Sequence, residues 1–118
     1  MPGNKILGID TSNYTTSVAL YGDGEVVQKK KLLPVKPGEL GLRQSDAVFH
    51  HTQQLPPLME ELMEPVSDKI EAIGVSVRPR DQEGSYMPCF TVGASSSRIL
   101  AAALHIPLFT FSHQAGHI

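Results

Sequence analysis

The 118-residue sequence predicts a single α/β domain whose elements follow the order βββαβαβ. Three observations support this fold class. The chain opens with apolar runs of strand length that are separated by short polar turns. Two later stretches carry apolar or small residues at helical spacing, and a short apolar run of strand type follows each of them. Strands that alternate with helices in this way are typical of α/β crossover connections.

The first two predicted strands enclose a polar turn. Ile6, Leu7 and Ile9 form an apolar run that stops at Asp10, and residues 18–21 resume the apolar character. The backbone N–H groups of a tight turn can point at an anion, and the Asp10 carboxylate can hold a metal ion or a water. The alternative is an ordinary hairpin whose side chains cap their own backbone. Five hydroxyl-bearing residues lie in this turn: Thr11, Ser12, Thr15, Thr16 and Ser17.

A hairpin turn and a third strand are predicted next. Gly22-Asp23-Gly24 is a strong turn signal, and residues 25–33 have strand character. The lysine run 29–31 is typical of an exposed edge strand that resists pairing with other chains. A nucleic-acid patch is the alternative interpretation of this run. The first three strands are therefore expected to form an antiparallel meander.

Residues 45–64 predict the first helix, with Ser45 or Asp46 as its N-cap. Pro56-Pro57 interrupts the helical pattern, so a kinked or two-piece helix is expected. His50 and His51 are adjacent and leave a helix about 100° apart, so they cannot both face one ligand. We expect both histidines to lie on the helix surface or to serve in packing. The apolar face carries Val48, His51 and Leu55, and then Leu58, Met59, Leu62 and Met63.

The second half of the chain predicts a strand, a helix and a strand. Residues 70–77 are almost continuously apolar, as in a central strand covered on both faces. They lead into a charged loop, residues 78–84, at a strand end where open α/β sheets bind ligands. The second helix is expected at about 88–104 and the fifth strand at 106–111. One helix side is built of small residues that permit close approach of a sheet or another helix: Gly93, Ala94, Ser97 and Ala101.

Composition limits the class of protein. With 41% hydrophobic and 19% charged residues the chain is globular, and its net charge of −2 provides no general electrostatic attraction to nucleic acid. A single cysteine, Cys89, excludes an internal disulfide and suits a reducing compartment. No apolar run approaches the roughly 20 residues of a membrane span, and the N-terminus carries no signal-peptide pattern. We therefore expect a soluble, cytoplasmic protein without membrane association.

The chain closes on a histidine motif that follows the fifth predicted strand. His113 and His117 lie four residues apart, so they would share one face of a helix capped by Ser112 and could bind a metal together. The motif is not that of zinc peptidases, because Gln114 follows His113 and no general base is supplied. Endopeptidase activity is therefore not expected.

Three separated blocks resemble one protein family. Gly8-Ile9-Asp10-Thr11-Ser12 with residues 16–20 resembles the first phosphate loop of the actin-like ATPase superfold. Residues 51–58 resemble the first helix of the tRNA threonylcarbamoyltransferase family, formerly labelled O-sialoglycoprotein endopeptidases, and residues 112–117 resemble its metal motif. The resemblance covers essentially the whole chain. It implies an actin-like (ribonuclease H-like) lobe with a mixed five-stranded sheet and helices packed on it.

The resemblance also implies the site residues. His113 and His117 would hold an iron or zinc ion, which positions a threonylcarbamoyl-adenylate derived from ATP for attack by a tRNA adenosine. Nucleotide phosphate with magnesium would lie near Asp10, Thr11, Ser12 and Thr16. The resemblance leaves the catalytic residue unidentified.

Several residues depart from the family pattern. The acidic residue of the closing motif is Ala115 here, and its leading asparagine is Ser112. The family's Gly-Pro-Gly after the fourth strand is Arg78-Pro79-Arg80, two arginines that could clamp phosphate. The first loop differs from the family as well, and Arg98 replaces the lysine usual in the second helix. These departures leave open a divergent paralogue with another carbamoyl or acyl substrate.

Two functional interpretations remain. The first is the N-terminal lobe, residues 1–118, of a transferase whose second lobe is absent from this chain; such a lobe is expected to be inactive alone. The second is a non-catalytic scaffold subunit of the same tRNA-modification system. Asp10 in place of the family's glutamate favours the scaffold, whereas His113 and His117 favour the enzyme. Either interpretation expects a homodimer or heterodimer through the two helices, with tRNA reached only through the full-length complex.

Overall fold

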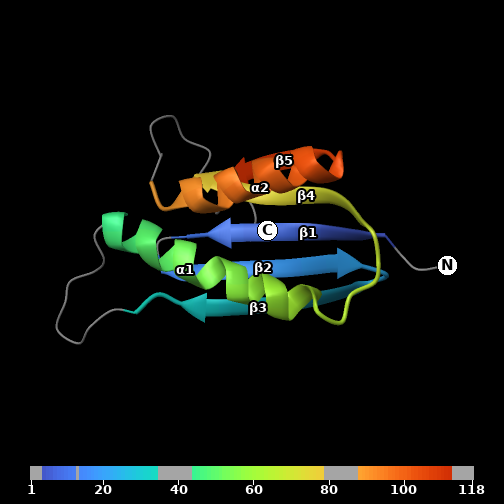
Figure 1. Ribbon diagram of the computed structural model, residues 1–118, viewed down its shortest axis with the longest axis horizontal. Coiled ribbons are helices and arrows are strands. Elements are labelled where there is room, and N and C mark those ends of the chain that lie inside the picture. Colours follow the sequence, from blue (N-terminus) through green and yellow to red (C-terminus); the bar gives the residue numbers. More distant parts are fainter. Residues whose placement is uncertain (1–3, 13, 35–43, 79–87, 113–118) are drawn as a thin grey trace.

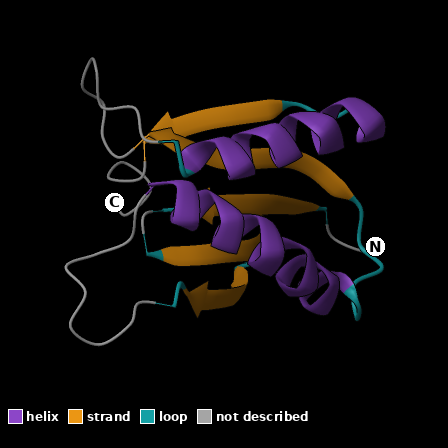
Figure 2. Ribbon diagram, turned by 60° about the vertical axis from the view of Figure 1, so that its left-hand side comes forward, coloured by secondary structure: helices purple, strands orange, loops and turns teal. Residues whose placement is uncertain are grey.

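The computed structural model describes residues 4–12, 14–34, 44–78 and 88–112, and it confirms the predicted element order. Both helices lie on the same face of one five-stranded sheet (Figures 1 and 2). The elements are β1 (Lys5–Thr11), β2 (Thr15–Gly22), β3 (Glu25–Leu32), α1 (Gln44–Met63), β4 (Ile70–Arg78), α2 (Phe90–Leu104) and β5 (Leu108–Ser112).

The sheet is mixed, and its strand order is β3-β2-β1-β4-β5. β1 pairs antiparallel with β2 and parallel with β4, and β4 pairs parallel with β5. The predicted meander is therefore confirmed, and the two helices make crossover connections. Because β1, β4 and β5 run in the same direction, their carboxyl ends meet at one edge of the sheet, which we call the carboxyl edge.

The β2–β3 hairpin turn follows from local sequence. Gly22 pairs with Glu25, and the two residues between them have positive φ, 54° at Asp23 and 74° at Gly24. Positive φ at both positions defines the turn that matches the twist of paired strands, and Asp-Gly is favoured there. As predicted, β3 is an edge strand (Figure 1).

Of the expected kinked or two-piece helix, the two-piece form is not observed, because the first helix is one continuous element with Pro56 and Pro57 inside it. Pro56 and Pro57 lie on its exposed side, as do Thr52 and Gln53, whose carbonyls lose N–H partners to the prolines. Water can satisfy those carbonyls, while buried leucines on the opposite side hold the helix to the sheet. The helix begins at Gln44, so Ser45 and Asp46 lie in its first turn rather than before it.

The core lies between the sheet and the helices. Neighbouring strands present their apolar side chains in register, with Ile9 opposite both Val18 and Val75. Ile9, Val18 and Val75 are at most 1% exposed, so the centre of the sheet is fully covered on this face. The buried cluster contains Leu7, Ile9, Val18, Leu20, Leu55, Leu58, Leu62, Ile73, Val75 and Ala101.

Helix α2 packs closely on β1 and β4 through its small side, as its sequence indicated. Gly93, Ser97 and Ala101 are buried there. A Cβ atom at Gly93 would lie 3.1 Å from the Thr11 Oγ1 atom, 3.3 Å from Ile9 Cγ2 and 3.4 Å from Val75 Cγ2. Glycine therefore sets how near the helix backbone comes to the sheet.

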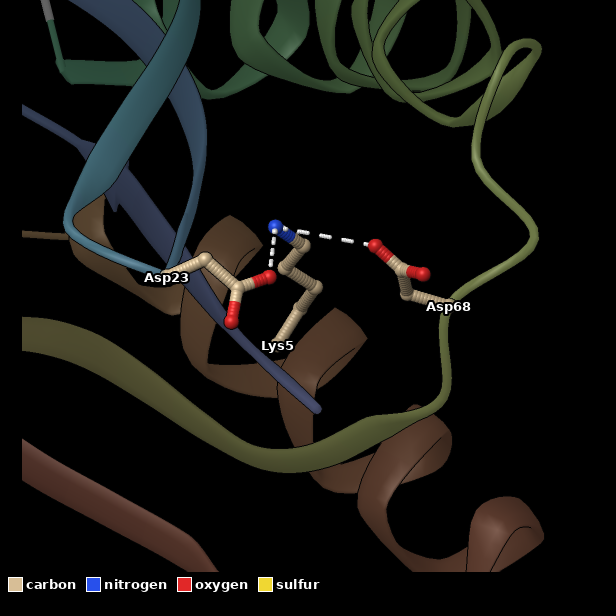
Figure 3. Close-up of polar contacts among 3 residues, drawn as sticks. All are labelled: Lys5, Asp23 and Asp68. Carbon is tan, nitrogen blue, oxygen red and sulfur yellow. Dashed lines mark hydrogen bonds and ion pairs between the residues drawn. The ribbon is translucent and has the colours of Figure 1, made fainter. Parts of the chain in front are cut away.

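The opposite end of the sheet is held by a lysine between two carboxylates. Lys5 Nζ lies 3.3 Å from Asp23 Oδ2 in the hairpin turn and 3.6 Å from Asp68 Oδ2 in the loop before β4 (Figure 3). The hydrogen bond to Asp23 is the main reason that the pKa of Lys5 is raised above 10.5. This cluster links the first strand to two later segments and lies far from the carboxyl edge.

The described helices cover only one face of the sheet, so the expectation of a central strand covered on both faces is met on one side alone. The other face exposes Ile6, Tyr21, Val26 and Phe109 by 41–61% of their surface. Within the described part of the chain, neither helix is long and apolar enough to cross a membrane.

Candidate functional site at the first turn

The turn between β1 and β2 closes on its own backbone. Ser12 N–H donates to the Thr15 carbonyl at 3.1 Å, and Thr15 N–H donates to Ser12 Oγ at 3.3 Å. The Ser12 hydroxyl also donates to the Thr15 carbonyl at 3.2 Å. Ser12 thus makes the capping contacts of an ordinary polar hairpin, the alternative considered from sequence.

Thr11 joins the end of β1 to the start of α2. Its hydroxyl donates to the Cys89 carbonyl at 2.9 Å and accepts from Gly93 N–H at 3.1 Å. Thr11 is fully buried, so both hydrogen bonds of its hydroxyl are made to groups within the protein. Cys89 is also buried, and burial raises the pKa of its thiol to about 11, which leaves it protonated and a poor nucleophile at neutral pH.

Thr16 joins the start of β2 to helix α1. Its Oγ1 lies 2.7 Å from His51 Nδ1 and accepts a hydrogen bond from Gln54 Nε2 at 3.0 Å. The other ring nitrogen of His51, Nε2, contacts the Ser12 carbonyl. Thr16 and His51 are both fully buried. The His51 side chain of α1 therefore contacts both the β1 side and the β2 side of the turn.

The network assigns the tautomer of His51. A carbonyl oxygen can only accept, so Nε2 carries the proton that is donated to Ser12. Nδ1 is then the acceptor for the Thr16 hydroxyl, whose own oxygen accepts from Gln54. Burial lowers the pKa of His51 from its ordinary 6.5, and the Ser12 carbonyl and the Asp10 carboxylate oppose this only in part. His51 is therefore neutral in the folded protein at pH 7.

Asp10 points to the opposite face of the sheet from Thr11, because successive residues of a strand alternate. It pairs with Ser17 across the strands, and both line a groove of about 150 Å³. Gln28 Nε2 donates to Ser17 Oγ at 2.9 Å in the same groove. The groove is lined by Gly8, Ile9, Asp10, Ser17, Ala19, Tyr21, Gln28 and Phe111.

The structure brings the four residues predicted to lie near phosphate together, but it separates their side chains. Thr11 and Thr16 face the helices and are already hydrogen-bonded, whereas Asp10 faces the groove. Arg78 is the last residue of β4 and therefore lies at the carboxyl edge, where β1 also ends just after Asp10. The side chain of Arg78 is not described. Arg80, His113 and His117 lie outside the described residues, so the clamp and metal assignments stay predictions. Within the described ranges no three metal-binding side chains gather into a group.

Sequence reasoning missed the role of His51. It was expected on the surface or in packing, yet it anchors the turn through both ring nitrogens. A usable signal was present: His51 and Gln54 are polar residues on the stripe of α1 that also carries Leu55 and Leu58. A polar side chain on a buried stripe requires a partner. Threonines at a strand end were the available partners.

Comparison with known proteins supports the resemblance noted above. No protein-family model matches the chain. It is 29% identical over 113 residues to the tRNA N6-adenosine threonylcarbamoyltransferase of Methanopyrus kandleri, covering 95% of this chain and 32% of the relative. The chain resembles the N-terminal lobe of these transferases. A probable bifunctional tRNA threonylcarbamoyladenosine biosynthesis protein of Haloquadratum walsbyi is 28% identical, over 97% of this chain and 22% of that protein.

The chain spans about a third of the length of the transferases that it matches. Its fold is shared with YeaZ from Pseudomonas aeruginosa, with a TM-score of 0.66 and 22% identity over 92% of this chain and 44% of YeaZ. The predicted actin-like lobe is therefore confirmed as the fold.

Proposed function

We propose that this chain forms the N-terminal lobe of a tRNA N6-adenosine threonylcarbamoyltransferase-like protein and contributes the first turn to its nucleotide site. The main observation that supports this proposal is the similarity to such transferases over about 95% of the chain. The position of Asp10 at the carboxyl edge supports the location of the site, because open α/β sheets bind ligands beside the carboxyl ends of their strands.

The described residues favour different roles for the side chains of the first turn: Asp10 would act at the ligand, and the two buried threonines would act on the turn. The Asp10 carboxylate would organise the water shell of a magnesium–nucleotide complex, since magnesium keeps several waters and takes few carboxylates. Thr11 and Thr16 would shape the turn rather than touch phosphate, because their hydroxyls are buried and hydrogen-bonded. Ser12 remains half-buried at the turn and could contact the ligand.

Other parts of the proposal rest on the sequence alone. These are iron or zinc at His113 and His117, an ATP-derived adenylate, and a phosphate clamp by Arg78 and Arg80. The arginines replace family glycines and favour a carbamoyl or acyl substrate that differs from the usual one. We propose a cytoplasmic location on the same basis, the sequence alone. The isolated lobe would be inactive, because the family's nucleotide lies between two lobes.

Replacing Asp10 with alanine is expected to weaken binding of magnesium–ATP by about tenfold to hundredfold, the range of a charge-assisted contact. Ser12→Ala removes one neutral hydroxyl and is expected to cost about tenfold or less. Binding is measured by titrating the full-length protein, which carries both lobes, with magnesium–ATP, and the melting temperature is recorded for each variant.

Asp23→Ala is the matched control, because it removes a carboxylate at the opposite end of the sheet and should leave binding unchanged. If Asp10→Ala binds magnesium–ATP as the wild type does, the first turn is only a hairpin. The non-catalytic scaffold subunit would then be the better account of the chain.

We also propose that a second copy of the chain binds across α1 and α2. The helices lie side by side on one face, and they expose Phe49, Ile99 and Leu104 by 51–69%. Sedimentation velocity is expected to show a dimer at micromolar concentration, which Ile99→Asp converts to a monomer. Phe109→Asp, on β5, is the control and should remain dimeric. A wild-type monomer at all concentrations would contradict this proposal and leave a heterodimer as the alternative.

A further inference from the structure

His51 is the one side chain of helix α1 for which hydrogen bonds to both arms of the first turn are described. Its Nε2–H donates to the Ser12 carbonyl on the β1 side, and its Nδ1 accepts from Thr16 Oγ1 on the β2 side at 2.7 Å. Gln54, one turn further along the helix, donates to the same Thr16 oxygen at 3.0 Å. The three bonds run in one direction, from the Gln54 amide through the Thr16 hydroxyl and the imidazole to the Ser12 carbonyl.

This directed chain works only with a neutral imidazole. Protonation places a hydrogen on Nδ1, where the Thr16 hydroxyl proton now points. The Thr16 hydroxyl must then rotate, because its oxygen would receive hydrogen bonds from both Nδ1 and Gln54. Its own proton loses its acceptor in a fully buried position, which is costly. A charged ring would also lie in surroundings that disfavour charge.

We propose that His51 is a pH-responsive positioning residue: its neutral ring holds the two arms of the first turn together, and its protonation releases them. Helix α1 therefore does more than cover the sheet, since its register against β2 sets the shape of the turn. The role in positioning a ligand rests on the proposed function, whereas the effect on the turn itself does not.

The charged and titratable groups around His51 lie on three elements. Asp10 on β1 favours its protonated form, and His50 on the same helix disfavours it. Lys31 on β3 lines a groove with His50, and its backbone carbonyl accepts from Gln54 at 3.5 Å. Burial outweighs the favourable groups, so the pKa of His51 in the folded protein lies below its ordinary 6.5.

The direction of the pH effect follows from linkage. The unfolded chain, with the ordinary histidine pKa, binds the proton first as pH falls. Stability that His51 contributes is therefore complete above about pH 6.5 and is lost as the pH falls below that value. Loosening of the turn should appear in the same range.

Amide hydrogen exchange of the full chain tests the effect on the turn without any ligand. Protection factors of the Ser12 and Thr15 amides, corrected for intrinsic exchange, are expected to fall about tenfold between about pH 7.5 and about pH 5. The Val66 amide, which bonds to Met63 at the other end of the sheet, serves as the internal reference. Flat protection of the turn across this range in the wild type would overturn the proposal.

Two conservative variants separate the two contacts. His51→Gln can keep a donor near the Ser12 carbonyl, and His51→Asn can keep an acceptor near Thr16, but neither titrates near neutral pH. Both are expected to remove the pH dependence, while His50→Gln should retain it. Pronounced pH dependence in a folded His51→Gln protein would contradict the assignment. Imidazole ¹⁵N shifts of the wild type require no variant and should show the Nε2–H tautomer; the Nδ1–H tautomer would equally overturn it.

A second arm measures the affinity of the full-length protein, which carries both lobes, for magnesium–ATP across the same pH range. Affinity is expected to fall with the protection of the turn in the wild type and to become independent of pH in His51→Gln. If no nucleotide binds at any pH, the proposed function fails, and the exchange experiment still decides the role of His51. If nucleotide binds with a pH profile that His51→Gln leaves unchanged, the positioning role fails.

Discussion

Replacing Gly93 with leucine is expected to lower the free energy of unfolding by about 3 kcal/mol, the upper range of overpacking in a filled core. A single added Cβ would already lie 3.1–3.4 Å from three atoms of β1 and β4. Three further carbons have no space unless α2 moves away from the sheet. Such movement would also break the hydrogen bond from Gly93 N–H to Thr11. Urea denaturation followed by circular dichroism measures the loss.

Two variants of α2 serve as controls for the Gly93 experiment. Ser95→Leu adds the same side chain at an exposed position of the helix and is expected to change stability by less than about 0.5 kcal/mol. Gly93→Ala is expected to stay within about 1 kcal/mol of the wild type, because the gain in helix propensity offsets the tight contacts. If Gly93→Leu proved as stable as Ser95→Leu, the close approach of helix and sheet would be wrong.

Replacing Thr16 with valine is expected to cost about 2–4 kcal/mol of unfolding free energy. The change keeps the shape of the side chain but removes the hydroxyl that donates to His51 and accepts from Gln54. His51 Nδ1 then loses its donor, and Gln54 Nε2 keeps only the 3.5 Å contact to the Lys31 carbonyl. Each buried polar group that loses a partner costs about 1–3 kcal/mol. Thermal and urea unfolding at pH 7.5 would measure the effect.

The control for this substitution is Thr110→Val, which makes the same change at an exposed position of β5. It is expected to be neutral, because water replaces the lost contacts. Thr16→Val should also weaken the dependence of stability on pH below 6.5, since His51 then lacks the donor that opposes its protonation. A Thr16→Val protein as stable as Thr110→Val would mean that the network contributes little.

Much of the fold could be predicted from sequence because the relevant signals are local. The turn at Asp23-Gly24 depends on two residues that tolerate positive φ, and both adopt it. The small side of α2 is a periodic pattern within one helix, and its buried members are three of the four predicted. The two-piece helix expected at Pro56-Pro57 was wrong, because the cost of a proline depends on whether water reaches the carbonyls, and sequence alone does not state which side is exposed.

The sequence by itself determined the element order, the edge position of the lysine-bearing strand, the polar turn after β1 and the resemblance to one transferase family. Each is a property of contiguous residues or of their spacing. The tertiary structure alone decided how the turn's hydroxyls are used: Thr11 bonds to α2 and Thr16 to His51, while Asp10 faces the other side of the sheet. The partners of Thr16 lie 35 and 38 residues away in sequence. Only the packing of α1 on β2 brings them together, and no local pattern encodes that register.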